Sequence, residues 1–453
     1  MRAFHILGLN SRNHLYLSRF NLRSGKRIAD SKLLTKKFLK KLKLPHPRLI
    51  VSFSQVADVN NFDWNSLEDN FVIKPAGGFA GEGIVLIRRK MVKMVKNGHN
   101  RLKNSSPFSH SDHSSHSSSV NFQLMDGSII TLSDLKLHVL DILEGRFNRL
   151  NLQDTAIIEE RVYKHPKFRR YAYQGTPDVR IIVFNKVPVM AALRLPTPES
   201  KGRANIHQGA IMVGIDLATG ITTAASHWDK PISRVPGSNF RLTGLEIPFW
   251  DRMMELAVEV QEHISLGYMA IDFLIDPGKG PLIVELTARP GMGIQIANMS
   301  GLRRRIERVE GLEDVTPGRG IEVAKALFAE RFSDKIMAER GVKVVSVFET
   351  AKLKDAKGIK IELPAKIDTG AFRSSIDREL AESLGLMKNR AVLWHDYYVS
   401  SLGREKRPVI PVTFWLIGRK IETTANVSDR SKMKEKFLIG RRDLSTFMVR
   451  PGK

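Results

Sequence analysis

The sequence contains no cysteine among its 453 residues. Disulfide bonds, thiolate metal sites and a cysteine nucleophile are therefore excluded, and this composition fits a reducing, cytoplasmic compartment. No run of 18 apolar residues occurs, so we expect no membrane-spanning helix. The opening residues MRAFHILGLNSRN lack a small-residue cleavage site, and we expect no signal peptide. Hydrophobic residues form 42% and charged residues 26% of the chain, as in globular proteins of two to four domains.

Acidic residues are scarce relative to basic ones, and the net charge is +25. Residues 1–50 carry 13 Lys and Arg against one acid, Asp30, and residues 341–453 carry 23 basic against 13 acidic residues. The excess positive charge is thus concentrated toward the two ends. It indicates either a solvated basic surface or an acidic partner such as nucleic acid, the ribosome, an anionic polymer or a membrane surface. No zinc-finger spacing or RNA-binding aromatic motif favours nucleic acid.

The chain divides into regions of different composition. Residues 104–119 contain nine serines and three histidines in 16 positions, which cannot form a core. We interpret them as a surface loop, with metal binding by the histidines as the alternative. Strand-like and helix-like segments alternate before residues 331–342, whereas short β-branched runs follow them. We therefore predict a domain at 1–330, a linker at 331–342 and a mostly-β domain at 343–453.

A glycine-rich loop lies within FVIKPAGGFAGEGIVLI, residues 71–87. Apolar, strand-like runs flank it, and Lys74 ends the first run. Glycines allow backbone N–H groups to approach phosphate oxygens, and a lysine there adds positive charge. The loop lacks the Gly-Lys-Ser/Thr ending of a Walker A motif, and no helix follows it at once. It indicates a phosphate site, with a simple glycine-rich hairpin as the alternative; its glycines are Gly77, Gly78, Gly81 and Gly83.

Residues 28–47 show apolar side chains at helical spacing, which predicts an amphipathic helix that ends before Pro45. Lys32 falls in its first turn. The start of a helix favours anions, so a lysine there serves a ligand better than it serves the helix. A solvated lysine is the alternative interpretation.

Two apolar strand-like runs, residues 268–276 and 281–291, each contain one acid, Asp272 and Glu285. An acid inside a buried strand is costly unless it is paired or binds a metal. Magnesium takes one or two carboxylates together with phosphate oxygens and water. Two acids on adjacent strands therefore indicate Mg²⁺ bound with a nucleotide triphosphate, with two surface-facing acids as the alternative.

Further candidate polar side chains lie between these segments. AIIEERV, residues 156–162, is expected to be a strand that ends in acids, and residues 176–197 are expected to form a hairpin. GRANIHQGA, residues 202–210, follows the hairpin. Together the hairpin and this segment carry Asp178, Arg180, Arg194, Arg203, Asn205 and His207.

These motifs, in this order from Lys32 through KPAGGFAGEG, IEERV, PDVRIIV, RANIHQGA and DFLID to ELTARPG, resemble an ATP-grasp ligase. The text is most similar to the alpha-L-glutamate ligase-like branch, over roughly residues 4–305. The resemblance implies that ATP phosphorylates a carboxylate and that an amine, glutamate or another amino acid, attacks the acyl phosphate. It implies ATP and Mg²⁺ as cofactors, with Mn²⁺ as a possible substitute. Because residues 1–31 alone precede Lys32, we expect a reduced N-terminal lobe.

The resemblance also implies a role for each matching residue. Lys32 and Lys74 contact the phosphates, and the glycine loop folds over them. Adenine and ribose lie at the hinge formed by Glu159, Glu160 and Val162. The family usually has asparagine two residues after the metal-binding glutamate, where this chain has Thr287. The implied metal ligands are Asp272, Glu285 and Thr287, and the groups around the γ-phosphate and acyl carbon are Arg180, Arg194, Asn205 and His207.

A second motif lies in the C-terminal region. Residues 360–376 run into Asp368-Thr369-Gly370, and KFLIGRRDL follows at 436–444. The two resemble the retropepsin-like aspartic protease fold, in a bacterial family often labelled ATP-dependent zinc protease, although no HExxH motif supports zinc proteolysis. We therefore expect an α+β chain, with an ATP-grasp fold followed by a small mostly-β retropepsin-like acid protease domain.

Aspartic proteases need two carboxylates that share a proton. This chain has one Asp-Thr-Gly, so the resemblance implies a homodimer in which each C-terminal domain supplies its Asp368. The alternative is that Asp368 caps a turn and the domain only binds peptide. For the whole chain, the alternatives to a ligase with a protease-like module are an ATP- or peptide-binding protein with degenerate sites, and a basic ribosome- or nucleic-acid-associated factor.

Overall fold

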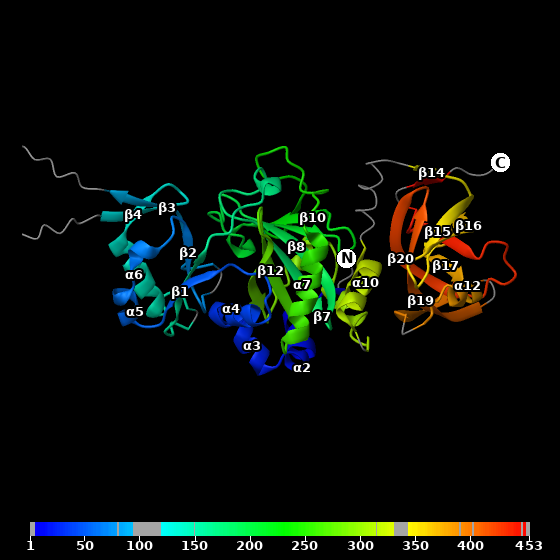
Figure 1. Ribbon diagram of the computed structural model, residues 1–453, viewed down its shortest axis with the longest axis horizontal. Coiled ribbons are helices and arrows are strands. Elements are labelled where there is room, and N and C mark those ends of the chain that lie inside the picture. Colours follow the sequence, from blue (N-terminus) through cyan, green and yellow to red (C-terminus); the bar gives the residue numbers. More distant parts are fainter. Residues whose placement is uncertain are drawn as a thin grey trace, which may run out of the picture.

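The computed structural model describes residues 5–78, 81–93, 119–148, 150–313, 315–329, 343–388, 391–400, 403–444 and 447–449. The Ser- and His-rich stretch, except Ser119, and the expected linker at 331–342 lie outside the described residues. Figure 1 shows three groups of elements in a row, and three hydrophobic cores belong to them, with Leu393 of the C-terminal group packed into the core of the second group. The domain boundaries at 330 and 343 stay a prediction. No described helix is both long and apolar enough to cross a lipid bilayer.

The first group is a six-stranded sheet with two helices. Its strand order is β1 (Leu49–Phe53), β6 (Ala156–Glu160), β2 (Phe71–Pro75), β3 (Val85–Lys93), β4 (Ser119–Leu124) and β5 (Ile129–Thr131). The helices are α5 (Val56–Asn61) and α6 (Leu132–Leu143), and Thr131 and Asp134 form a capping box at the start of α6. Strands β2 and β3 are antiparallel, so the glycine-rich segment connects two strands as the sequence predicts.

The second group is built on a seven-stranded sheet whose neighbours are all antiparallel. Its order is β11 (Lys230–Ile232), β10 (Thr222–His227), β9 (Ile211–Ile215), β8 (Val187–Leu195), β7 (Asp178–Phe184), β12 (Tyr268–Asp276) and β13 (Gly280–Thr287). Its helices include α7 (Trp250–His263), α8 (Ile294–Ala297), α9 (Leu302–Glu307) and α10 (Pro317–Phe328). The predicted hairpin at 176–197 is β7 and β8, and the two acid-bearing runs are the paired strands β12 and β13.

The N-terminal segment packs on this second group as short helices, which Figure 1 draws in blue below the sheet. They are α1 (Leu9–Ser11), a π-helical segment (Arg12–Leu17), α2 (Ser18–Phe20), α3 (Arg23–Ala29) and α4 (Lys32–Lys41). The single helix expected over 28–47 is therefore wrong in its bounds. The Ser31 side chain accepts a hydrogen bond from the Leu34 N–H at 3.3 Å and starts a new helix at Lys32. The expected place of Lys32, in a first helical turn, is correct.

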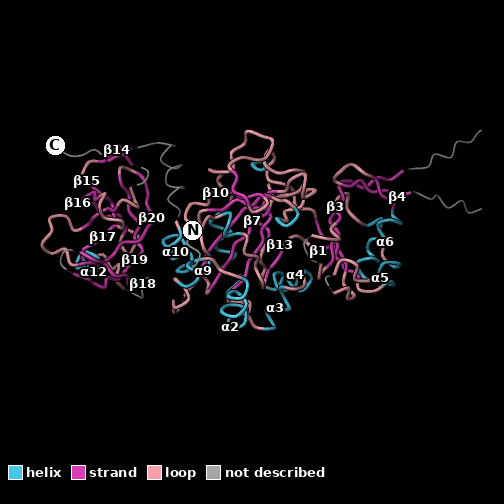
Figure 2. The backbone as a smooth tube through the Cα atoms, turned by 180° about the vertical axis from the view of Figure 1, so that it is seen from behind, coloured by secondary structure: helices cyan, strands magenta, loops and turns pink. Residues whose placement is uncertain are grey.

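The C-terminal group is mostly β, as Figure 2 shows. Its main sheet runs β15 (Phe348–Lys354), β16 (Lys360–Asp368), β21 (Phe437–Gly440), β17 (Ser374–Asp377), β20 (Arg419–Ser428), β19 (Gly403–Leu416) and β18 (Trp394–Ser400). An additional β15–β19 pairing makes the sheet close back on itself. Strand β14 (Lys343–Val345) pairs with β22 (Phe447–Val449), and α12 (Arg378–Ser383) follows β17.

Candidate functional site

A buried cluster of two lysines and one glutamate connects α4 with the first sheet. The Lys36 Nζ lies 2.5 Å from one Glu159 carboxylate oxygen, and the Lys74 Nζ pairs with the other. Burial alone would raise the Glu159 pKa, but the charges of Lys74 and Lys36 hold it below its usual value. Burial lowers the pKa of Lys36. The cluster keeps one net positive charge, which suits a bound anion.

Lys32 contacts both the predicted phosphate loop and one of the predicted metal ligands. Its Nζ donates to the Gly78 carbonyl at 2.8 Å and lies 3.9 Å from a Glu285 carboxylate oxygen. Its backbone N–H donates to the Ala76 carbonyl at 2.8 Å. The structure therefore brings the start of α4, the glycine-rich segment and the acid of β13 together, although they are far apart in sequence.

The glycine-rich segment is fixed at both of its described ends. The Gly77 N–H donates to the two Asp154 carboxylate oxygens at 2.9 and 3.0 Å. Gly83 has φ +70°, and a Cβ there would lie 2.6 Å from the Phe147 ring. Gly81, at φ +78°, has more room, since the nearest atom to a Cβ would be 3.7 Å away. Sequence reasoning missed Asp154, because a loop aspartate carries no distinguishing signal.

An arginine–carboxylate network lies on one face of the second sheet. Arg180 on β7 forms a two-bond pair with Asp272 on β12, with distances of 2.7 and 2.6 Å. Arg194 on β8 pairs with Asp178 at 2.6 and 2.5 Å and reaches Asp272 at 2.7 Å. Asp272 lies opposite both Arg180 and Glu285 in the strand register, so these side chains share one face.

The network shifts the ionisation of its members. Asp272 is 1% exposed, and burial would raise its pKa, but Arg180 and Arg194 hold that pKa below its ordinary value. Burial, aided by the charge of Asp272, raises the Asp178 pKa to about 6 against the opposing effect of Arg194. Burial alone would lower the Arg194 pKa, but the two aspartates raise it. The Nη1 groups of both arginines take no part in these bonds.

The two acids of β12 and β13 fit a magnesium site completed by a nucleotide. Asp272 and Glu285 face each other across the strand pair, and the Glu285 side chain is 43% exposed. Thr287 lies two residues beyond Glu285 on the same strand. Within the described residues, no three acidic or histidine side chains gather to hold a metal by themselves. Magnesium bound by two carboxylates and phosphate oxygens needs no such group.

The expected adenine hinge connects the two sheets. Glu160 accepts a hydrogen bond from the Arg48 N–H at 2.9 Å and pairs with the Lys279 Nζ at 2.5 Å. Val162 is buried, and its carbonyl accepts from the Thr176 hydroxyl at 3.3 Å. Lysines thus bind the carboxylates of both hinge glutamates, so these side chains fix the hinge in place.

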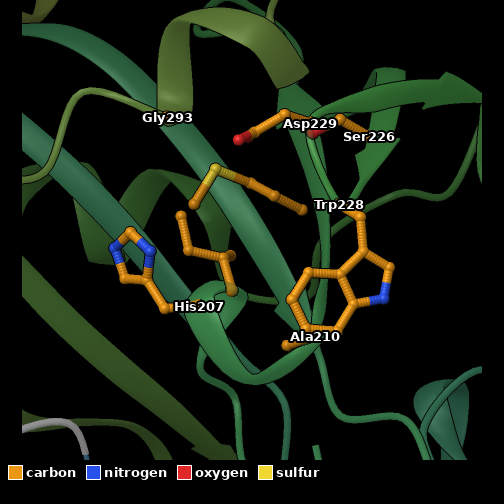
Figure 3. Close-up of a pocket in the computed structure, with 8 residues that line it drawn as sticks. His207, Ala210, Ser226, Trp228, Asp229 and Gly293 are labelled. Carbon is orange, nitrogen blue, oxygen red and sulfur yellow. The ribbon is translucent and has the colours of Figure 1, made fainter. Parts of the chain in front are cut away.

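Asn205 and His207 lie outside the arginine–carboxylate network, on a 3₁₀ turn (Ile206–Gln208) that precedes β9. The Asn205 side chain accepts from the His207 backbone N–H at 3.0 Å and caps the turn. The exposed His207 lines a cavity of about 120 Å³, which Figure 3 shows together with Trp228 and Asp229. Sequence reasoning missed Trp228 and Asp229, although a Trp-Asp pair in a tight turn is an unusual sequence signal.

Asp368 ends β16 at the start of a tight turn. One of its carboxylate oxygens accepts from the Gly370 N–H at 2.9 Å and the Ala371 N–H at 3.0 Å. Gly440 on the parallel strand β21 lies opposite Asp368. The Arg441 guanidinium donates to the Gly370 carbonyl at 3.2 Å. The turn therefore holds one partly exposed carboxylate at the end of a parallel strand pair.

The first two groups of elements match the ATP-grasp proteins in sequence. The family model for sugar-transfer associated ATP-grasp proteins matches residues 11–125 and 115–311. The chain therefore belongs to the sugar-transfer associated ATP-grasp family, which implies ATP-dependent ligase activity. This match carries no statement about glutamate, so the finer resemblance to alpha-L-glutamate ligase-like proteins stays a prediction. A comparison with curated proteins finds no match.

Among solved structures, the ATP-grasp ligase PsnB bound to a minimal precursor is similar over 64% of this chain and 63% of its own, with 13% identity and a TM-score of 0.31. A protein of unknown function from Legionella pneumophila (DUF785) matches over 24% of this chain and 94% of its own, with 18% identity and a TM-score of 0.18. The retroviral protease-like domain of Ddi1 from Leishmania major matches over 22% and 77%, with 23% identity and a TM-score of 0.17.

This chain spans about 63% of the length of PsnB. The expected fold class is confirmed: α+β, with an ATP-grasp fold followed by a small mostly-β retropepsin-like domain.

Proposed function

We propose that this chain is an ADP-forming carboxylate–amine ligase. The observation that carries the proposal is the position of Lys32, which contacts both the glycine-rich segment and Glu285 in a chain of the ATP-grasp family. A carboxylate oxygen of the acceptor attacks the γ-phosphorus of ATP, and ADP leaves. The amine then attacks the acyl carbon, and phosphate leaves as the amide forms. Positive groups that flank the transferring phosphoryl group stabilise its charge.

The residues divide this work by position. Lys32 and Lys74 would bind the phosphates under the glycine-rich segment, and the base would lie at the hinge of Glu160 and Val162. Within the described residues, the Nη1 groups of Arg180 and Arg194 are not used in the carboxylate pairs, and they would donate to the transferring phosphoryl group. Mg²⁺, or Mn²⁺ in its place, would be held by Asp272, Glu285 and the weaker Thr287 hydroxyl, and would neutralise phosphate charge. Asn205 and His207 would flank the acyl group.

The partners follow from the charge distribution. A chain with net charge +25 suits an acidic carboxylate acceptor, such as a peptide rich in acidic residues. The cysteine-free composition suits a cytoplasmic enzyme.

We further propose that the C-terminal domain is an aspartic peptidase module that works as a homodimer. The support is the partly exposed Asp368 carboxylate at the Asp-Thr-Gly turn. Two such carboxylates sharing one proton would activate a water molecule for attack on a peptide carbonyl. One chain supplies one of them, so the second would come from another copy.

A second candidate function is an ATP-binding protein without turnover. The observation that favours it is the double pairing of Asp272, whose two oxygens accept three hydrogen bonds from arginines. A carboxylate bound in this way offers fewer lone pairs to a metal ion. Thr287, in place of the family's asparagine, also weakens the metal site.

The test is phosphate release by the purified chain with Mg²⁺ and ATP, against a panel of amino acids and acidic peptides, with mass spectrometry of the same reactions. The ligase predicts ADP together with a new amide mass. ATP binding without turnover for any pair of substrates would support the binding protein and contradict the ligase.

A further inference from the structure

The cavity at β9 and β10 lies beside the acyl end of the proposed site, with which it shares His207. Ile206, Ala210 and Met212 form its apolar part, and Trp228, Asp229 and His207 surround it (Figure 3). Met212 lies opposite Arg194 in the strand register, so the cavity adjoins the arginine–carboxylate network on the same face of the sheet. Three strand spacings separate Met212 on β9 from Asp272 on β12, about 14 Å. A group bound here is therefore remote from the acids expected to bind metal.

The wall of the cavity is a strained turn. Trp228 and Asp229 form the two-residue connection between β10 and β11, and both have left-handed backbones, with φ of +49° and +59°. Such turns favour Asn-Gly, and a tryptophan there is disfavoured. Gly209 packs against the indole, since a Cβ there would lie 2.7 Å from the ring. The Gly209 carbonyl accepts from the His227 Nε2 at 2.9 Å, which fixes the wall.

Among the described lining residues, one carboxylate, Asp229, supplies negative charge to the cavity, in contrast to the net positive charge of the whole chain. Asp229 has no ion-pair partner within the part of the chain that the structure describes, and Figure 3 shows its carboxylate directed over the cavity. The described lining contains no lysine or arginine. The guanidinium of the neighbouring Arg194 is already paired with Asp178 and Asp272. An indole face beside an unpaired carboxylate is the combination that binds an organic cation.

We propose that this cavity binds a cationic group of the amine substrate, through the Trp228 ring and the Asp229 carboxylate. This inference rests on the proposed ligase and specifies its second substrate: an amino acid with a basic side chain, or a diamine. Glutamate, which the family resemblance implies, would bring a second carboxylate against Asp229. The group held at Asp229 is the end of the substrate remote from the nitrogen that reacts.

The test is calorimetric titration of the full chain, with and without a non-hydrolysable ATP analogue and Mg²⁺. The ligands are L-lysine, L-arginine, cadaverine, L-norleucine and L-glutamate. We expect at least one cationic ligand to bind at least tenfold more tightly than norleucine, the uncharged analogue of lysine. Asp229→Asn, which keeps a residue suited to the left-handed turn, should weaken that binding at least tenfold. Asp251→Asn, at an exposed aspartate of α7, should leave it unchanged.

Two outcomes overturn the proposal: no cationic ligand binds in either condition, or glutamate binds as tightly as the best cation with Asp229→Asn unchanged. The ligase is tested separately, because binding is measured without turnover. Asp229-dependent cation binding without ADP formation would contradict the ligase and leave the cavity assignment standing. Amide formation with glutamate and with no other amine would support the ligase and contradict the cavity assignment.

Discussion

Glu159 is the buried counter-charge of two lysines in the nucleotide half of the site. We expect Glu159→Gln to lower the free energy of unfolding by about 3–5 kcal/mol, because it leaves Lys36 and Lys74 buried without a negative partner. Glu160→Gln is the matched control. Its pair with Lys279 is half exposed, and we expect a loss below about 1 kcal/mol. Urea unfolding of both variants measures the difference, and equal losses would contradict this role.

Glu159 should also make the stability of the folded chain depend on pH. The Glu159 pKa is lower in the folded chain than its ordinary value of 4.5, so its stabilising effect is present above pH 4.5 and is lost as pH falls through the folded pKa. The stability difference between the wild-type chain and Glu159→Gln should therefore narrow on acidification below 4.5. Urea midpoints measured at several pH values check this, and a difference that widens toward acid would show the opposite sign.

Lys32 contacts both the glycine-rich segment and Glu285 in the proposed site. We expect Lys32→Ala to reduce ATP turnover about 10²–10³-fold, because one positive donor to the phosphates is removed. Lys37→Ala removes an exposed lysine of the same helix and should leave turnover unchanged. Phosphate release by the two variants is the measurement. Full activity in Lys32→Ala would remove this lysine from the site.

Some residues of the site could be predicted from sequence because they stand out locally. Asp272 and Glu285 interrupt apolar strands, and Lys74 ends a strand beside glycines. Burying a charged side chain is costly unless it has a partner, so charged residues in such strands indicate a site. Lys36 lies in a lysine-rich helix and Asp154 in a loop, where nothing distinguishes them from solvated side chains. Their roles depend on contacts with Glu159 and Gly77, which are distant in sequence.

At the scale of the element, hairpins of neighbouring strands could be predicted and helix ends could not. The β7–β8 and β12–β13 pairs follow from consecutive apolar runs. The separation of α3 from α4 depends on one capping serine, Ser31. The apolar pattern continues across Ser31, so the sequence predicts one helix there and hides the break. The arginine–carboxylate network depends on the pairing of β7 with β12, strands whose separation in sequence hides their contact.

In the β10–β11 turn, Asp229 is expected to favour cation binding and to lower the stability of the folded chain. Asp229→Gly should raise the free energy of unfolding by about 1 kcal/mol, because glycine adopts the left-handed backbone without strain. The same substitution removes the carboxylate and should abolish cation binding. Thermal unfolding and the titration described above test both effects. A destabilised variant would show that this turn carries no strain.

At the scale of the whole molecule, the single Asp-Thr-Gly predicts self-association. We expect the full chain to be a dimer at micromolar concentration in light scattering, and Asp368→Asn to abolish peptide cleavage while ligase activity is unchanged. The reason is that Asp368 lies in the C-terminal sheet, whose described strands pair with one another and with none of the described ATP-grasp strands. A monomer would contradict the shared active site, and loss of both activities would contradict their independence.

The proposed ligase forms an acyl phosphate from ATP, and oxygen transfer tests this step most directly. Acidic peptides whose carboxylates carry ¹⁸O, L-lysine, Mg²⁺ and ATP would be incubated with the chain, and the released phosphate analysed by mass spectrometry. The ligase predicts one ¹⁸O in each phosphate, because the carboxylate oxygen that attacks phosphorus leaves with it when the amide forms. Phosphate without ¹⁸O, released with ADP, would show simple ATP hydrolysis and contradict the proposed ligase.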